Sequence, residues 1–315
     1  MGDPLAERTT RAFPDRSVAS VDTRETRRGN ATGLVRFEEH DPVYLKTTTD
    51  GPTRLVREIA ATRYAGANAP IRVPGVVAAD PDVPYLATEP LPGTPLNEPW
   101  TDDGDRERLL RRAGAALART HEARFDRTGT VEGGDAASLE LAGDDWVDTL
   151  RRTAAWRAED WFPDRFADIP DRLIETVTEL APTIDERPAL LHGDCSRINV
   201  HVDPTGLLDW ERALVGDPAF DLVDAEGHLI DQIDVDEGDR DRLRAALYDG
   251  YTATAGSLPT GLAARRPLYR AFAHLLVPQT FESWAPTVET PNDELAADVR
   301  EEFESRVAAA REAMT

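Results

Sequence analysis

The sequence "LLHGDCSRINV", Leu190–Val200, followed by "LLDWE", Leu207–Glu211, places several polar side chains inside apolar, strand-like sequence. The polar residues concerned are His192, Asp194, Asn199 and Asp209. A polar group that is buried without a partner costs roughly 2–7 kcal/mol. These side chains therefore either satisfy one another or bind a metal ion and a substrate.

A tight turn is predicted inside this stretch, because "DPTG", residues 203–206, separates two apolar segments. A hairpin centred on Pro204 would place Asn199 opposite Asp209. An amide oxygen and a carboxylate are hard ligands that suit Mg²⁺. Asp194 lies five residues before Asn199, close enough to orient a substrate hydroxyl beside such a metal. The spacing therefore favours phosphoryl transfer, which also needs a cation on the donor phosphates.

The cation available for that task is Lys46, which is the only lysine in the chain. It lies in "VYLKTT", residues 43–48, an alternating segment that predicts a strand. An ammonium is a compact point charge, whereas the guanidinium of arginine is a wide planar fork. A narrow site that contacts two phosphates can therefore require lysine where arginine is used elsewhere.

The chain is strongly acidic, since 36 Lys and Arg residues stand against 59 Asp and Glu residues, a net charge of −23. Nucleic-acid binding is not expected, because it needs a basic stripe and none is visible. The charge is typical of adaptation to a salt-rich cytoplasm: near 1 M salt the Debye length is about 3 Å, which screens the self-repulsion.

Targeting and covalent features are few. No stretch approaches the roughly 18 apolar residues of a membrane span, and the first residues, "MGDPLAERTTRAF", contain no signal-like apolar core. We expect a cytoplasmic protein that does not associate with membranes. Cys195 is the only cysteine, so an internal disulfide or a thiolate zinc site is excluded.

The secondary-structure pattern divides the chain into two parts. Residues 1–90 show five alternating segments and one helix that carries Glu58, which indicates a small β-rich lobe. The Pro- and Gly-rich segment "EPLPGTPL", residues 89–96, marks the boundary. Residues 91–315 are predicted to be mainly helical, and the opening stretch is their only expected strand-like interruption.

With these motifs in place, the chain resembles the aminoglycoside phosphotransferase-like family of small-molecule kinases, which are relatives of protein kinases. The motifs are "HGDCSRIN", residues 192–199, and "LLDWERALVGDPAFDL", residues 207–222. The resemblance implies an α+β, protein-kinase-like fold of two lobes. It also implies ATP and Mg²⁺ as cofactors and a small-molecule hydroxyl as phosphate acceptor.

The resemblance implies a role for each matching residue. Asp194 corresponds to the catalytic base, and Asn199 and Asp209 correspond to the metal ligands. Nucleotide binding is implied for Lys46, its helix partner Glu58, the loop residues Gly29 and Asn30, and the adenine-binding hinge Thr88, Glu89, Pro90 and Leu91. Structural support of the catalytic and metal loops is implied for His192, Asp217 and Asp221.

Alternatives remain open at this stage. A nucleotide-binding regulatory pseudokinase would share the fold but typically lacks one of the four residues Asp194, Asn199, Asp209 or Lys46. Cys195 beside His192 could instead form a thiol nucleophile with its base. The other histidines show no metal-ligand spacing and are expected to be structural or surface residues: His40, His121, His201, His228 and His274. Aminoglycosides, sugars, amino alcohols and fructosamine-type adducts all remain possible acceptors, and the oligomeric state is left open.

Overall fold

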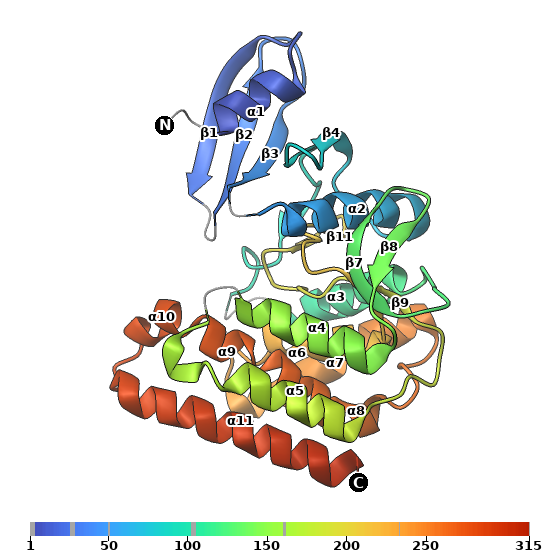
Figure 1. The fold of residues 1–315 in the computed structure, drawn as a ribbon, viewed down its shortest axis with the longest axis vertical. Helices are drawn as coiled ribbons and strands as arrows, with labels where there is room; N and C mark the ends of the chain where they lie inside the picture. Colours follow the sequence, from blue (N-terminus) through green and yellow to red (C-terminus); the bar gives the residue numbers. More distant parts are fainter. Residues whose placement is uncertain are drawn as a thin grey trace. The chain divides into compact units, whose positions relative to one another are not determined.

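A computed structural model describes residues 4–25, 29–49, 51–101, 105–159, 162–232 and 234–314 (Figure 1). The chain forms two compact units. The first contains Met1–Gly104, Val131–Leu141 and Arg197–Ala213, and the second contains Asp105–Thr130, Ala142–Ser196 and Leu214–Thr315. The mixed α+β class predicted from sequence is confirmed, whereas the division into lobes at residue 90 stays a prediction.

The first unit is built on a five-stranded antiparallel sheet with the order β1-β2-β3-β5-β4. All five strands coincide with segments that alternation predicts. Their bounds are Val18–Glu25, Asn30–Phe37, Val43–Thr48, Val76–Asp80 and Tyr85–Thr88 for β1 to β5.

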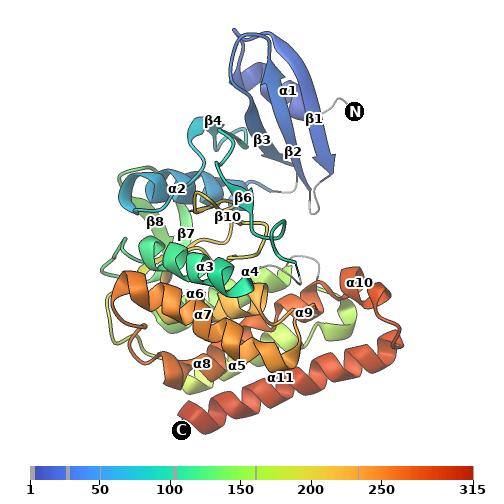
Figure 2. The same cartoon turned by 180° about the vertical axis from the view of Figure 1, so that it is seen from behind.

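Two helices cover the two faces of this sheet. Helix α1 (Pro4–Ala12), which the sequence pattern does not predict, lies across one face in Figures 1 and 2 and shares an apolar cluster with Leu45. Helix α2 (Thr53–Asn68) packs Leu55 and Ile59 against Leu86. Successive strand side chains point to opposite faces. Because Leu45 faces α1, its neighbour Lys46 faces α2.

The first unit also contains two short β structures. Strand β10 (Val200–Val202) pairs with β11 (Gly206–Leu207) on one side and β6 (Thr94–Pro95) on the other. Strands β7 (Gly129–Gly134) and β8 (Leu139–Ala142) form a hairpin closed by Asp135, whose carboxylate accepts the amides of residues 137 and 138. The expectation of a single strand-like interruption after residue 91 is therefore wrong, because this glycine-rich hairpin is too short to show clear alternation.

The second unit is mainly helical, and strand β9 (Ala189–Leu191) pairs in it with β12 (Leu214–Gly216). Its helices are α3 (Arg106–Thr120), α4 (Trp146–Glu159), α5 (Ile169–Leu180), α6 (Pro218–Leu229), α7 (Glu237–Ala255), α8 (Leu262–Ala273), α9 (Leu276–Gln279), α10 (Phe281–Trp284) and α11 (Asn292–Met314). Figures 1 and 2 show α11 along α5 and α8. Within the described residues, no helix combines the length and apolar character that a membrane span requires.

Helices α3 and α7 cross in close contact at two glycines. A Cβ atom on Gly114 would lie 2.0 Å from the carbonyl oxygen of Leu247, and one on Gly250 would lie 2.0 Å from that of Arg111. Any larger residue at either position would therefore force the two backbones apart. This contact fixes α3 against the rest of the second unit.

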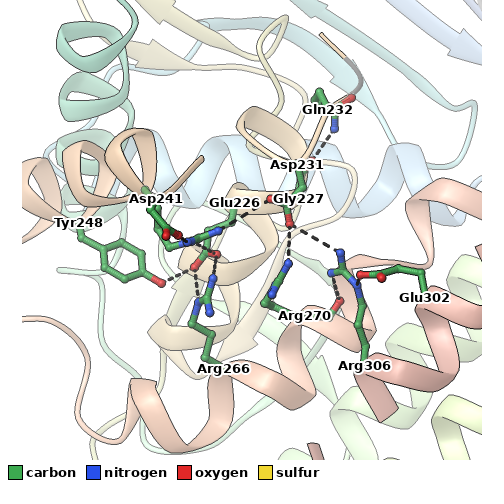
Figure 3. Close-up of polar contacts among 11 residues, drawn as sticks. Glu226, Gly227, Asp231, Gln232, Asp241, Tyr248, Arg266, Arg270, Glu302 and Arg306 are labelled. Atoms are coloured by element: carbon green, nitrogen blue, oxygen red, sulfur yellow. Dashed lines mark hydrogen bonds and ion pairs between the residues drawn. The ribbon is translucent and has the colours of Figure 1, made fainter. Parts of the chain in front are cut away.

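Helix α6 is anchored at its carboxyl end by a buried ion-pair network (Figure 3). Glu226 is fully buried and accepts hydrogen bonds from Arg244 and Tyr248 of α7 and from both Nε and Nη2 of Arg266 of α8. Breaking one member of such a network would leave an uncompensated buried charge, which is strongly destabilising. The network therefore holds α6 at a defined position between α7 and α8.

Candidate active site

Lys46 gathers three carboxylates around its ammonium group. Its Nζ lies 2.7 Å from Glu58 Oε2 of α2, 2.9 Å from Asp209 Oδ1 and 3.1 Å from Glu211 Oε2. The strand alternation that turns Lys46 toward α2 explains the contact with Glu58. The segment that follows β11 supplies the other two carboxylates. The structure thus brings together the predicted residues Lys46, Glu58 and Asp209 and adds Glu211.

Three carboxylates face the ammonium of Lys46, and Arg54 lies 3.9 Å from the other oxygen of Glu211. Burial opposes the charge on Lys46, but attraction from the carboxylates, Asp209 first, raises its pKa well above the ordinary value. Burial raises the pKa of Glu58. The positive charge of Lys46 lowers it in part, whereas the negative charges of Asp209 and Glu211 raise it further. For Glu211 burial is the largest single effect and opposes the charge, but the attractions of Lys46, Arg212 and Arg54 together exceed it, so its pKa is lowered.

The same carboxylates offer a fit for a divalent cation. One oxygen each from Glu58, Asp209 and Glu211 lies within 4.8 Å of the others. Carboxylate oxygens are the ligands that Mg²⁺ prefers in proteins. Glu211 was missed by sequence reasoning. Its only signal in the sequence was its position two residues after Asp209.

The hairpin that carries the predicted metal ligands has a different register from the expected one. Val200 pairs with Leu207 and His201 with Gly206, so the turn is centred between residues 203 and 204. The Leu208 amide donates to the carbonyl oxygen of Asn199 at 3.0 Å, so Leu208 occupies the position expected for Asp209. The prediction that Asn199 lies directly opposite Asp209 is therefore wrong by one residue.

Asp209 leaves the hairpin through an unusual backbone conformation. Its φ of 65° lies in the left-handed region, which Asp tolerates better than most residues but which still costs free energy. The ion pair with Lys46 offsets part of this cost. Asn199 is buried and directly precedes β10. Its carbonyl oxygen accepts a hydrogen bond from the Leu208 amide.

In the second unit, Asp221 of α6 holds the loop that follows β9. Its two carboxylate oxygens accept the amides of His192 and Gly193, each at 2.8 Å. His121 Nε2 lies 3.0 Å from the same carboxylate. Burial opposes the charge of Asp221, but these partners lower its pKa. The His192 ring accepts the amide of Asp194 at 3.3 Å, so the loop is held on both sides of its glycine.

Asp217 is also buried, but its contacts lie elsewhere. It caps α6 by accepting the Ala219 amide at 3.0 Å and receives Arg265 Nε at 2.6 Å and the Tyr269 hydroxyl at 2.7 Å, both from α8. These contacts tie α6 to α8. The expected support of the metal loop by Asp217 stays a prediction.

Asp194 itself contacts a histidine that the sequence pattern did not single out. Its Oδ1 lies 3.3 Å from His228 Nδ1, and His228 Nε2 lies 3.4 Å from Asp224 Oδ2. Arg157 of α4 binds Asp224 with both terminal nitrogens, at 3.0 and 3.2 Å. His228 was expected to be structural or on the surface, and of these two possibilities the structure shows a buried residue.

The thiol alternative finds no support in the surroundings of Cys195. The side chain is buried, with 1% exposure. Burial raises its pKa well above the ordinary value, and the negative charges of Asp221, Asp194 and Asp224 raise it further. A nucleophilic cysteine needs a lowered pKa. Cys195 therefore behaves as a buried apolar residue.

The residues expected to bind the nucleotide base and phosphates occupy strand ends of the first unit. Gly29 has φ 68°, and its carbonyl oxygen accepts the Thr49 amide at 2.9 Å; the preceding loop residues 26–28 lie outside the described residues. Asn30 begins β2. Thr88 ends β5, and the next amide, that of Glu89, donates to the carbonyl oxygen of Gly75 at 2.8 Å. Pro90 and Leu91 follow.

Comparison with known protein sequences identifies a family for this chain. Residues 27–268 match the sequence model of the phosphotransferase enzyme family. A search of curated protein sequences gave no match.

Solved structures share the fold at low sequence identity. A Thermobifida fusca protein assigned as a fructosamine-3-kinase is 21% identical, with a TM-score of 0.61 over 99% of this chain and 100% of that chain. The GDP complex of a mutant aminoglycoside 2′-phosphotransferase is 16% identical, with a TM-score of 0.60 over 99% and 100%. A choline/ethanolamine kinase family protein from Mesorhizobium loti is 17% identical, with a TM-score of 0.57 over 99% and 95%. Because the family match spans well over half of the sequence, this chain belongs to the phosphotransferase enzyme family.

Proposed function

We propose that this protein is an ATP- and Mg²⁺-dependent kinase that phosphorylates a hydroxyl group of a small molecule. The observation that supports it most directly is the group formed by Lys46, Glu58, Asp209 and Glu211, because it combines a fixed cation with hard metal ligands. These are the parts that stabilise charge on a transferred phosphoryl group. A regulatory pseudokinase would have little reason to keep them together with Asp194.

For the metal ion, we propose Asp209 and Asn199 as ligands, with Glu211 as a further carboxylate. A bound Mg²⁺ would neutralise negative charge on the phosphates. Glu58 holds Lys46 from α2, and Lys46 in turn contacts the phosphates of the nucleotide. Gly29 and Asn30 are proposed to cover those phosphates from the β1–β2 loop.

For the nucleotide base, the segment Thr88–Leu91 offers backbone groups. The amide of Glu89 already donates to Gly75, so we propose that the amide of Leu91 binds the adenine ring. The fold alone does not select the base, since one structure with this fold contains GDP. Competition between ATP and GTP for binding would measure this preference.

For the chemical step, Asp194 orients the acceptor hydroxyl and accepts its proton. The hydroxyl oxygen forms a bond to the γ-phosphorus while the bond from that phosphorus to the bridging oxygen of ADP breaks. General-base catalysis of this kind typically contributes about 10²- to 10⁴-fold in rate. We therefore expect Asp194→Asn to lower kcat by at least about 100-fold while nucleotide affinity stays within about twofold.

The test compares wild type with Asp194→Asn and with Asp126→Asn, an exposed aspartate in an ion pair with Arg187, as matched control. Phosphorylated products and ADP are followed by ³¹P NMR in high KCl, with aminoglycosides, choline, ethanolamine and fructosamine adducts as acceptors. Nucleotide binding is measured by calorimetry. An Asp194→Asn enzyme with wild-type turnover would refute the assignment of the base. Mg·ATP binding with no turnover of any acceptor would favour the regulatory alternative.

A further inference from the structure

His228 lies between two carboxylates, one of which belongs to the proposed catalytic base. Its Nδ1 is 3.3 Å from Asp194 Oδ1 and its Nε2 is 3.4 Å from Asp224 Oδ2. Its side chain is only 6% exposed. Asp224 belongs to the same helix, α6, one turn earlier, whereas Asp194 comes from the loop after β9.

The carboxylate behind His228 is itself fixed. Asp224 is held by both terminal nitrogens of Arg157, and Nη2 of Arg157 also donates to the carbonyl oxygen of Gly193 at 3.3 Å. Gln279 in turn donates to the carbonyl oxygen of Arg157 at 2.9 Å. Although burial opposes the charge, Arg157 and His228 lower the pKa of Asp224. His228 therefore has an ionised, immobile partner on one side.

The two ring nitrogens of His228 face different carboxylates. Nδ1 lies beside Oδ1 of Asp194, and Nε2 lies beside Oδ2 of Asp224. Each ring nitrogen of a histidine can act as a hydrogen-bonding group. Nδ1 is therefore the atom through which His228 can hold Asp194, while Nε2 keeps the ring in place against Asp224.

We propose that His228 is a positioning residue that holds Oδ1 of Asp194 and thereby sets the direction of Oδ2 toward the acceptor hydroxyl. The proposal rests on the function proposed above, because it assigns His228 a task in the reaction of Asp194. Helix α6 is suited to this task because the Glu226 network fixes it two residues before His228 (Figure 3). The Asp224–Arg157 pair supplies the rigid support.

Two conservative variants separate the two contacts of His228. The amide nitrogen of asparagine takes the place of Nδ1, so His228→Asn keeps a donor for Asp194. The amide nitrogen of glutamine takes the place of Nε2, so His228→Gln keeps a donor only for Asp224. Loss of a hydrogen bond to a charged group corresponds to about 10- to 100-fold in rate. We expect this fall in kcat, with an unchanged KM for ATP, in His228→Gln, and a fall of less than about fivefold in His228→Asn.

A second histidine provides a control. His274 is also buried, but it contacts Val299 of α11 instead of Asp194. We expect His274→Gln to leave kcat unchanged. Equal falls in kcat in His228→Gln and His274→Gln would show a general effect on the fold and would contradict a specific role of His228.

A spectroscopic measurement does not depend on the acceptor. Nitrogen-15 NMR of the histidine rings should show different His228 signals in Asp194→Asn and in the wild type, because Nδ1 of His228 lies beside the carboxylate that the substitution removes. Identical His228 signals in the two proteins, or wild-type kcat in His228→Gln, would overturn the inference. If Asp194→Asn is inactive, either of these results overturns only the role of His228 and leaves the proposed function intact. An active Asp194→Asn enzyme would instead overturn the proposed function itself.

Discussion

Lys46 shows why the identity of a single side chain matters in this protein. Every other cationic side chain is arginine, and several of these bind carboxylates in pairs of hydrogen bonds, as Arg266 does with Glu226. Three carboxylates from two directions can converge on one ammonium nitrogen, whereas a planar guanidinium cannot present one point to all of them. The need for a point charge therefore explains the one lysine.

The substitution Lys46→Arg tests this reading. Loss of one charge-assisted hydrogen bond, worth about 1.5–3 kcal/mol, corresponds to a fall in kcat/KM for ATP of about 10- to 100-fold. Steady-state kinetics with varied ATP measure it, and circular dichroism checks that the fold is retained. A matched variant is Arg36→Lys, whose ion pair with Asp22 lies at the exposed surface. Equal losses in the two variants would contradict the requirement for a point charge.

For single residues, the sequence predicted members of the candidate site by their type and spacing. It did not predict contacts between segments that lie far apart in the chain. Lys46 was found because it is the only lysine of the chain, and Glu58 was found because the resemblance to small-molecule kinases implies a helix partner for that lysine. Glu211 and His228 were missed. Glu211 contacts a lysine 165 residues earlier, and no periodicity encodes such a contact. The one-residue error at Asn199 came from the turn, since a small shift in its centre changes every opposed pair.

Among the elements, α6 does most to organise the second unit. Asp221, Asp224 and His228 recur at a spacing of three and four residues and therefore share one face, whereas Glu226 lies on the opposite side. The first face holds the 192–194 loop and Asp194, and the second binds α7 and α8. This polar stripe in a buried helix was the signal in the sequence that could have revealed His228.

Helices α8 and α11 are joined by a histidine that should make the fold sensitive to acid. His274 Nε2 lies 3.1 Å from the carbonyl oxygen of Val299, and no described residue is a hydrogen-bond partner of its Nδ1. Burial, followed by repulsion from Arg306, lowers the pKa of His274 to about 4. The unfolded chain, with an ordinary pKa near 6.5, binds a proton in this range while the folded chain does not. Stability contributed by His274 is therefore lost as the pH falls from about 6.5 toward 4.

We expect the wild type to lose about 2 kcal/mol more unfolding free energy than His274→Gln between about pH 7 and pH 5. Glutamine keeps a donor for Val299 and cannot be protonated, and carboxylates that titrate in the same range cancel in the comparison. Urea unfolding in high KCl at the two pH values measures the difference. Parallel losses in both proteins would show that His274 is not the group responsible.

For the whole molecule, the net charge of −23 dominates. Self-repulsion of this size opposes the compact state in dilute buffer, whereas the Debye length shrinks from about 10 Å at 0.1 M salt to about 3 Å at 1 M. Exposed ion pairs, such as that between Arg300 and Asp168, weaken over the same range, but the buried pairs around Glu226 are screened less. The net effect of salt should be stabilising.

We expect the melting temperature to rise by about 10 °C or more between about 0.1 M and 2 M KCl, which for a chain of this size reflects several kcal/mol. Differential scanning calorimetry measures the shift. Sucrose is the control, because it stabilises by exclusion from the surface without screening charge. Equal melting temperatures at the two KCl concentrations would refute adaptation to salt.

The amino-acid sequence by itself determined the class of fold, the five strands of the first sheet, the mainly helical character of the rest of the chain and most residues of the candidate site. These features depend on local periodicity, turn residues and motif spacing, which act over a few residues. The tertiary structure alone decided that Glu211 joins Lys46, that Leu208 rather than Asp209 pairs with Asn199, and that His228 contacts Asp194. Such contacts depend on register and helix packing, where the free energy is shared among many distant residues and no short stretch of sequence contains it.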